Sequence, residues 1–192
     1  MTPRRFEGKN VIVTGAGQGI GLAIAERFAA EGADVMLIGR RREPLEALVG
    51  QIETHGGAAW LHAADVSDSS AVDAAVAAAH ERWGRIDVLV NNAGIAEEKG
   101  FLEIEDESWD AIMATNLRGA FLMSQRVARV QVAAGGGAIV HIASIDASGG
   151  DGPYATTLRR LDCSASTGRW RSNSALTVFA STASVRGSLT PR

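Results

Sequence analysis

The chain has little cysteine, tyrosine and lysine. Its 192 residues include one cysteine, Cys163, one tyrosine, Tyr154, and two lysines, Lys9 and Lys99. A single cysteine excludes an internal disulfide and is typical of a reducing compartment, so we expect a cytoplasmic protein. No uncharged apolar run reaches the roughly 18 residues that a membrane-spanning helix needs, and no apolar signal core follows the first residues. We therefore predict neither a membrane segment nor export.

Neither the net charge nor the histidines indicate a binding site. The net charge of −3 gives no reason to expect nucleic-acid binding. The four histidines lack the spacing of metal ligands, so no metal site is predicted. His141 lies within an apolar run, which favours a core residue over a catalytic one.

What is present, from residue 9 to about 143, is an alternation of short apolar runs with amphipathic stretches. Val, Ile and Leu dominate several of the runs, as in parallel strands that are covered on both faces. Alternating strands and helices predict right-handed crossovers and an α/β, doubly wound parallel sheet. The expected strands are 10–14, 34–39, 58–63, 86–90 and 138–143, and the expected helices are 19–31, 43–54, 68–83 and 106–133.

A glycine-rich segment joins the first expected strand to the first expected helix. Gly15, Gly19 and Gly21 follow Thr14 in the order Gly-x3-Gly-x-Gly. Glycines allow a sharp turn and a close approach of phosphate oxygens, and the N–H groups of a helix start face negative charge. This turn predicts a site for a dinucleotide pyrophosphate; the alternative is an ordinary tight turn.

Four further motifs follow in order along the chain. Residues 63–66 (Ala-Ala-Asp-Val) close the third strand, and residues 91–94 (Asn-Asn-Ala-Gly) follow the fourth. Asn116 lies inside an expected helix, where Asn is unfavourable, and Ser144 ends the fifth strand. With the glycine turn, this set resembles the short-chain dehydrogenase/reductase family over residues 7–157. Each residue also has an ordinary alternative as a turn, cap or solvent-facing side chain.

The resemblance implies an oxidoreductase that interconverts a carbonyl and an alcohol with a nicotinamide cofactor, acts on a small-molecule substrate and, in an intact relative, forms a homo-oligomer. It implies catalytic roles for Ser144, Tyr154 and Asn116. It implies cofactor contacts for Gly15, Gln18, Gly19, Ile20, Gly21, Arg40, Asp65, Val66, Asn92, Ala93 and Gly94. A non-catalytic nucleotide-binding fragment is the alternative.

The sequence departs from the family pattern after Tyr154. Ser144 and Tyr154 are ten positions apart, fewer than is usual in the family, and Leu158 stands where the motif Tyr-x-x-x-Lys has its lysine. Such a lysine binds the ribose and lowers the pKa of the tyrosine. A unit charge about 4 Å away contributes roughly 4 kcal/mol at an effective dielectric of ~20, or about three pKa units. Without it, Tyr154 is expected to be a poor base.

Cofactor preference is predicted from the end of the second strand. Gly39 occupies the position where members that prefer NAD carry an acid, and Arg40, Arg41 and Arg42 follow it. An acid would repel a 2′-phosphate, whereas arginines pair with one. The prediction is NADP, with NAD possible; a solvated arginine patch is the alternative.

The α/β pattern stops near residue 157, so we divide the chain into a dinucleotide-binding domain, 1–157, and an aberrant tail, 158–192. The tail has six basic residues and one acid, whereas the first 157 residues have 13 and 21. Residues 168–192 can also be back-translated into codons and read in a shifted frame, in which the third base of each codon is joined to the first two bases of the next. The degenerate codon positions then permit the peptide ALAVELGPHGIRVNCVSPGFIDTP. That peptide resembles the next segment of the family. We expect a frame shift near codon 157, a poorly ordered tail and a sheet that lacks its C-terminal strands; an ordinary disordered basic tail is the alternative.

Overall fold

A parallel sheet with helices on both faces forms the centre of the structure, a computed structural model that describes residues 4–97, 101–144 and 175–182. The sheet order is β3-β2-β1-β4-β5-β6. The strands are β1 (Asn10–Thr14), β2 (Asp34–Gly39), β3 (Ala58–Ala63), β4 (Val88–Asn91), β5 (Gly137–Ser144) and β6 (Ala175–Thr182). The α/β, doubly wound prediction is confirmed.

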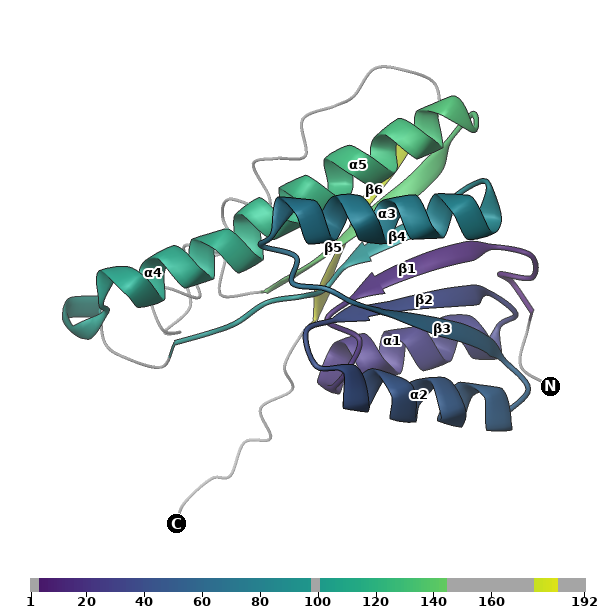
Figure 1. Ribbon diagram of the computed structural model, residues 1–192, viewed down its shortest axis with the longest axis horizontal. Coiled ribbons are helices and arrows are strands. Elements are labelled where there is room, and N and C mark those ends of the chain that lie inside the picture. The colour runs from purple at the N-terminus through teal and green to yellow at the C-terminus, as the bar shows by residue number, and fades with distance from the viewer. Residues whose placement is uncertain (1–3, 98–100, 145–174, 183–192) are drawn as a thin grey trace, which may run out of the picture.

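The helices form two layers, with α1 and α2 on one face of the sheet and α3 and α5 on the other (Figure 1). Their bounds are α1 (Gly19–Ala30), α2 (Arg42–Thr54), α3 (Ser69–Trp83), η1 (Phe101–Glu103), α4 (Asp106–Ile112), η2 (Met113–Arg118) and α5 (Gly119–Ala133). The expected helix 106–133 is thus continuous in sequence but changes its winding, because η2 is a π-helical turn.

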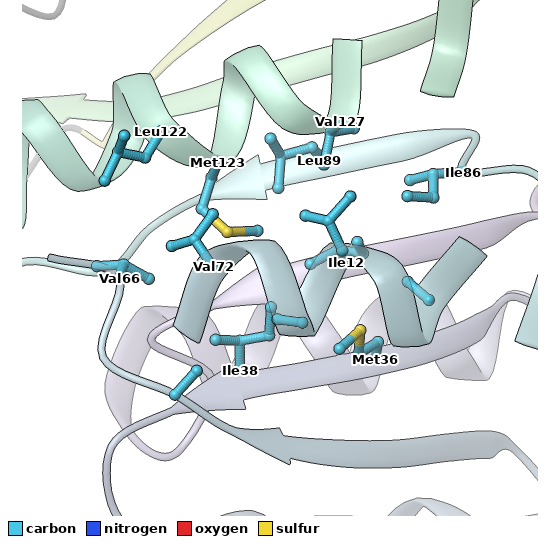
Figure 2. Packing of buried hydrophobic residues seen from close by; sticks show 14 of the residues in the cluster. Ile12, Met36, Ile38, Val66, Val72, Ile86, Leu89, Leu122, Met123 and Val127 are labelled. Carbon is cyan, nitrogen blue, oxygen red and sulfur yellow. The ribbon is translucent and has the colours of Figure 1, made fainter. Parts of the chain in front are cut away.

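Successive residues of β1 enter the two layers of core in turn. Ile12 packs with Met36 and Leu89 beneath α3 and α5 (Figure 2), whereas Val11 and Val13 pack toward α1 and α2. A strand covered on both faces needs apolar residues at every position, because successive side chains point to opposite faces. This explains why the central strands appear in the sequence as unbroken apolar runs.

All the pairings are parallel, so the carboxyl ends of the strands meet at one edge of the sheet, here called the carboxyl edge. Thr14 is in register with Ile38, Val13 with Val90, and Asn91 with His141. The segments that follow β1, β2, β3 and β4 therefore begin close together. In open α/β sheets, ligands bind at this edge.

One strand, β6, contradicts part of the prediction that the sheet lacks its C-terminal strands. β6 pairs with β5 in parallel, with Gly137 opposite Ala175 and Ser144 opposite Thr182, so β5 has a neighbour on both sides. The segment 175–182 (Ala-Leu-Thr-Val-Phe-Ala-Ser-Thr) holds β-branched and aromatic residues that favour strands. The prediction failed because it weighed the missing periodicity of the whole tail rather than this short run. The rest of the tail lies outside the described residues.

Candidate functional site

The glycine turn between β1 and α1 is closely packed on one side only. Gly15 and Gly19 have φ of 65° and 55°, in the left-handed region that favours glycine. A Cβ on Gly21 would lie 2.3 Å from the carbonyl oxygen of Gly15 and 2.4 Å from Nδ2 of Asn92. Nothing lies within 4 Å of a Cβ built on Gly19. The turn is therefore packed on its inner side and open on its outer side.

The N-terminus of α1 lies at this open side. Gln18 is the N-cap residue, its side chain makes no capping hydrogen bond, and the first turn of α1 holds no acid. The Gln18 side chain instead accepts a hydrogen bond from Nη2 of Arg41 at 2.5 Å through its Oε1. Ile20 is 48% exposed. The first N–H groups of α1, which have no partner within a helix, thus face a region that no side-chain cap occupies.

The segment after β4 is attached to the glycine turn by hydrogen bonds. Thr14 Oγ1 accepts from the backbone N–H groups of Asn92 and Ala93, each at 3.0 Å, and donates to the carbonyl of Val90. Asn92 Nδ2 donates to the carbonyls of Thr14 and Gly15 at 3.0 and 3.3 Å. These bonds fix the direction in which Ala93 and the exposed Gly94 leave the sheet.

Asn116 lies in the π-helical turn η2 and is 5% exposed. Its Oδ1 accepts from the backbone N–H of Ile95 at 2.8 Å, and its Nδ2 donates to the carbonyl of Ile95 at 3.0 Å. The alternative of a solvent-facing Asn is therefore wrong. π-Helical turns inside α-helices are frequent at functional sites, and this one holds the segment that follows β4.

Asp65 and Val66 form the turn after β3. Asp65 Oδ1 accepts from the N–H and from the hydroxyl of Ser67, at 2.9 and 2.7 Å. Asp65 is not the cap of the next helix, because Asp68 caps α3 by accepting from the N–H groups of Ser70 and Ala71. Val66 is buried at 6% exposure in the core beneath α5. Its role would therefore be through its backbone.

The three arginines after β2 differ in their partners. Arg41 donates to Gln18, and Arg42 pairs with Glu46 at 2.7 Å. Arg40 is exposed and makes no hydrogen bond or ion pair with the described residues. It is the one of the three that is free to meet an anion at this edge.

The structure describes only some of the residues that are predicted to be catalytic. Ser144 is the last residue of β5, at the carboxyl edge, and Asn116 has been placed above. Tyr154 and Leu158 lie outside the described residues, so the expected Ser–Tyr pair stays a prediction.

Two contacts of this region were not anticipated from the sequence. Arg41 reaches Gln18 across 23 positions, and Thr14 connects the glycine turn to the segment after β4. The position of Thr14, directly before the first glycine, was the one feature of the sequence that could have indicated its contact. Arg41 had none, because a run of three arginines does not tell which one turns back toward the glycines.

The described residues fit a dinucleotide. A glycine cradle without side chains, an open helix N-terminus and an unpartnered arginine are what a pyrophosphate and an adjacent phosphate need. No group of three or more His, Cys, Asp or Glu side chains is placed for a metal ion in the part of the chain that the structure describes. Nor does that part contain a helix with the length and apolarity to cross a membrane.

His141 is buried, as its apolar surroundings predicted. It is 7% exposed, its Nδ1 lies 3.5 Å from Nδ2 of Asn91, and burial lowers its pKa below the usual 6.5. The same Asn91 Nδ2 donates to Ser124 Oγ on α5 at 2.9 Å. His141 is therefore part of a polar contact between β4, β5 and α5.

Known proteins are similar to this chain in both sequence and fold. The chain is 44% identical over 140 residues to D-threitol dehydrogenase of Mycolicibacterium smegmatis, an alignment covering 73% of this chain and 54% of that protein. It is 40% identical over 155 residues to gluconate 5-dehydrogenase of Gluconobacter oxydans, covering 79% and 60%. The chain thus spans little more than half the length of these curated relatives.

A solved structure, the citronellol catabolism dehydrogenase of Pseudomonas aeruginosa, superimposes with a TM-score of 0.81 at 35% identity, covering 87% of this chain and 69% of that one. The model of the family described as short chain dehydrogenase matches residues 9–157. That match ends where the sequence departs from the pattern, just before Leu158. With the glycine turn, the parallel sheet and the segment after β4 as described, the chain belongs to the short chain dehydrogenase family.

Proposed function

We propose that this chain encodes an NADP-dependent oxidoreductase that interconverts a carbonyl and an alcohol on a small-molecule substrate. The observation that carries the proposal is the turn between β1 and α1, where a Cβ on Gly21 would lie 2.3 Å from the backbone. A turn that is packed against Gly15 and Asn92 on its inner side and open at Gly19, beside an uncapped helix start, is suited to a pyrophosphate. The relatives' names, dehydrogenases of sugar alcohols and sugar acids, agree with this class of reaction.

The residues of the site divide into binding and chemical roles. Gly15, Gly19 and Gly21, with the N–H groups that Gln18 and Ile20 contribute, would hold the pyrophosphate. Asp65 Oδ2, which has no hydrogen bond to the described residues, would accept from the adenine amino group, with the backbone of Val66 beside it. Asn92, Ala93 and Gly94 would line the nicotinamide side.

A bound nicotinamide would supply hydride transfer to or from the substrate carbon. The protein would then orient the substrate and handle the proton. Ser144 would donate a hydrogen bond to the carbonyl oxygen, Tyr154 would exchange the proton with it, and Asn116 would support the proton relay. The carboxyl-edge positions of Ser144 and Asn116 agree with these roles.

The preference for NADP rests on Arg40. The position before it is Gly39, so no carboxylate repels a 2′-phosphate there. Arg40 is exposed and unpaired among the described residues, whereas Arg41 and Arg42 are engaged by Gln18 and Glu46. Charge-assisted hydrogen bonds from a free guanidinium to a phosphate are among the strong ones.

Titration of the purified chain with NADPH and NADH, followed by fluorescence, tests the binding half. We expect saturable binding with NADPH tighter than NADH. Oxidation of NADPH with a panel of ketones and ketoses then tests the chemical half. Absence of binding for both nucleotides would contradict the proposal, and tighter binding of NADH would contradict its cofactor assignment.

A second candidate is a nucleotide-binding fragment without catalysis. It is favoured by Leu158, which stands in the position of the family's lysine, and by the end of the family match at residue 157. We infer that a frame shift near codon 157 converted a gene for the first candidate, an oxidoreductase, into one for the second, a fragment without catalysis. Sequencing the source DNA over codons 150–192 tests this, because an alternative frame must encode the peptide ALAVELGPHGIRVNCVSPGFIDTP. A DNA sequence in which no frame encodes it would overturn the frame-shift inference.

If the frame shift is found, a chain repaired to that frame should bind and also oxidise NADPH in the presence of its substrate, whereas the second candidate requires that the present chain only binds. Restoring Leu158→Lys alone should leave activity absent, because the segments that follow in the family would still be missing. Homo-oligomer formation belongs to the same proposal and is measured on both chains by light scattering.

A further inference from the structure

The start of α5 lies between two segments that leave the carboxyl edge of the sheet. On one side is the turn after β3, with Asp65, Val66 and Ser67. On the other is the segment after β4, where Asn116 bonds both backbone groups of Ile95. The residues next in sequence to Asn116 are therefore placed to connect the two.

Gly119 lies directly against Val66. A Cβ on Gly119 would lie 2.8 Å from Cγ2 of Val66 and 3.1 Å from its carbonyl oxygen. Val66 in turn packs with Val72 and Met123 in the core beneath α5 (Figure 2). Backbone on one side and a filled core on the other leave a side chain at position 119 no room without moving the Asp65–Ser67 turn. Gly119 has helical φ and ψ of −61° and −46°, so close approach and not backbone conformation requires this glycine.

Arg118 makes the second contact. Its Nη1 donates to the carbonyl of Ser67 at 2.5 Å, and its charge contributes to lowering the pKa of Asp68, after the hydrogen bonds from Ser70 and Ala71. Ser67 is the residue whose N–H and hydroxyl orient the Asp65 carboxylate. Arg118 thus holds Ser67, which orients the carboxylate of Asp65.

We propose that Gly119 and Arg118 are positioning residues that hold the Asp65–Ser67 turn against the helix carrying Asn116. They thereby fix where the adenine end of a dinucleotide sits relative to its nicotinamide end. The proposal rests on the proposed function for the ligand and on the described contacts for the geometry. Neither residue needs to touch the ligand.

The test compares Gly119→Ala and Arg118→Ala with a matched control, Arg126→Ala. Arg126 also joins α5 to the α3 region, by bonds to Asp73 and Ser69 at 2.9 and 3.0 Å, but it does not contact the Asp65–Ser67 turn. A loss that follows merely from loosening α5 on α3 would appear in all three variants. A loss specific to the turn would appear in the first two only.

The first readout is amide hydrogen exchange of Ser67, whose N–H donates to Asp65 Oδ1, followed by NMR without any nucleotide. We expect exchange about tenfold faster in Gly119→Ala and about threefold faster in Arg118→Ala, because local opening of the turn becomes easier. Arg126→Ala should match the unaltered chain. Unchanged Ser67 exchange in both test variants would overturn the proposal, and if Gly119→Ala does not fold, Arg118→Ala decides alone.

The second readout separates the two ends of the ligand, with ADP and nicotinamide mononucleotide as probes. We expect Gly119→Ala to bind ADP about tenfold more weakly and to bind nicotinamide mononucleotide as the unaltered chain does, since only the adenine turn has moved. Equal weakening of both probes would show a general structural effect and contradict the proposal. If the unaltered chain binds neither the probes nor NADPH or NADH, the proposed function fails, and the Ser67 exchange still decides the positioning role.

Discussion

The two edges of the sheet differ in whether their charged and polar groups are paired within the protein. At the edge where the strands begin, buried acids are fully paired. Glu31, whose side chain is 0% exposed, is held by Arg5 and Arg27, and Asp87, 7% exposed, by Lys9 and Arg85. At the carboxyl edge, α1 has no side-chain cap, and Arg40 lacks a partner among the described residues.

This difference separates stability from binding. Groups that are paired with each other leave nothing for a ligand, whereas helix-terminal N–H groups and a guanidinium without a protein partner remain available to an anion. Changes at the first edge should therefore alter the stability of the protein and spare nucleotide affinity. Changes at the carboxyl edge should chiefly alter affinity.

The largest expected effect is that of Gly21→Ala. The added Cβ would lie 2.3 Å from the carbonyl oxygen of Gly15, so the turn must move. We expect NADPH affinity to fall by at least about 100-fold, and the free energy of unfolding by roughly 1–3 kcal/mol, as for other overpacked sites. Isothermal titration and urea unfolding measure the two quantities.

Gly50→Ala is the matched control for this change. Gly50 lies inside α2 and has nothing within 4 Å of a built Cβ. A glycine in a helix interior is less favourable than alanine by about 0.8–1 kcal/mol. The control should therefore raise stability and leave NADPH affinity unchanged. If Gly21→Ala binds NADPH like the control, the carboxyl edge is not the binding edge.

Arg40→Ala should have the next largest effect. Loss of a charge-assisted hydrogen bond to a 2′-phosphate, about 1.5 kcal/mol, should weaken NADPH binding about tenfold and leave NADH binding unchanged. Arg42→Ala is the control, because Arg42 is paired with Glu46. Titration of both nucleotides against both variants measures the effect. Equal weakening of NADPH in the two variants would point to the general charge of the patch rather than to Arg40.

The sequence predicted most of the fold because the local signals were strong and consistent. Apolar runs typical of strands covered on both faces, and amphipathic stretches of ordinary helix length, predicted most of the strands and helices described in residues 10–144. It did not predict η2, because the reciprocal bonds of Asn116 to Ile95 come from a segment 21 positions away. It missed β6 because the lack of periodicity over the whole tail outweighed the short strand-favouring run 175–182, whose pairing with β5 the sequence does not indicate.

The site was predictable where glycines and motifs stand in one short segment. Gly15, Gly19 and Gly21 are such a case. Contacts made between distant segments were not predictable: nothing in residues 114–121 indicates that Gly119 meets Val66, or that Arg118 reaches Ser67 across 51 positions. Tertiary neighbours, not local propensity, decide these roles.

Glu31→Gln tests the first edge. Hydrogen bonds from Arg5 and then Arg27 lower the pKa of Glu31 from 4.5 to about 2. A lowered pKa means that the charged form stabilises the fold; this contribution is complete above pH 4.5 and is lost as the pH falls toward 2. The variant should therefore be less stable than the unaltered chain at pH 6, and the two should converge near pH 2. Urea midpoints against pH measure this, with Glu46→Gln in an exposed pair as control; NADPH affinity should not change.

His141→Gln gives the smallest effect and probes the buried contact between β4 and β5 with the same measurement. Burial lowers the pKa of His141 below 6.5, so the unfolded chain binds a proton more readily than the folded one. Stability should therefore fall as the pH drops below about 6.5, and the variant, which has no titrating group at position 141, should lose the part of the slope that His141 contributes. The two variants control each other, because Glu31→Gln should keep the slope near pH 6.5 and His141→Gln should keep the slope below pH 4.5. If His141→Gln leaves the slope near pH 6.5 intact, the buried contact between Asn91 and His141 does not make the stability depend on pH, and the pH dependence belongs to the first edge alone.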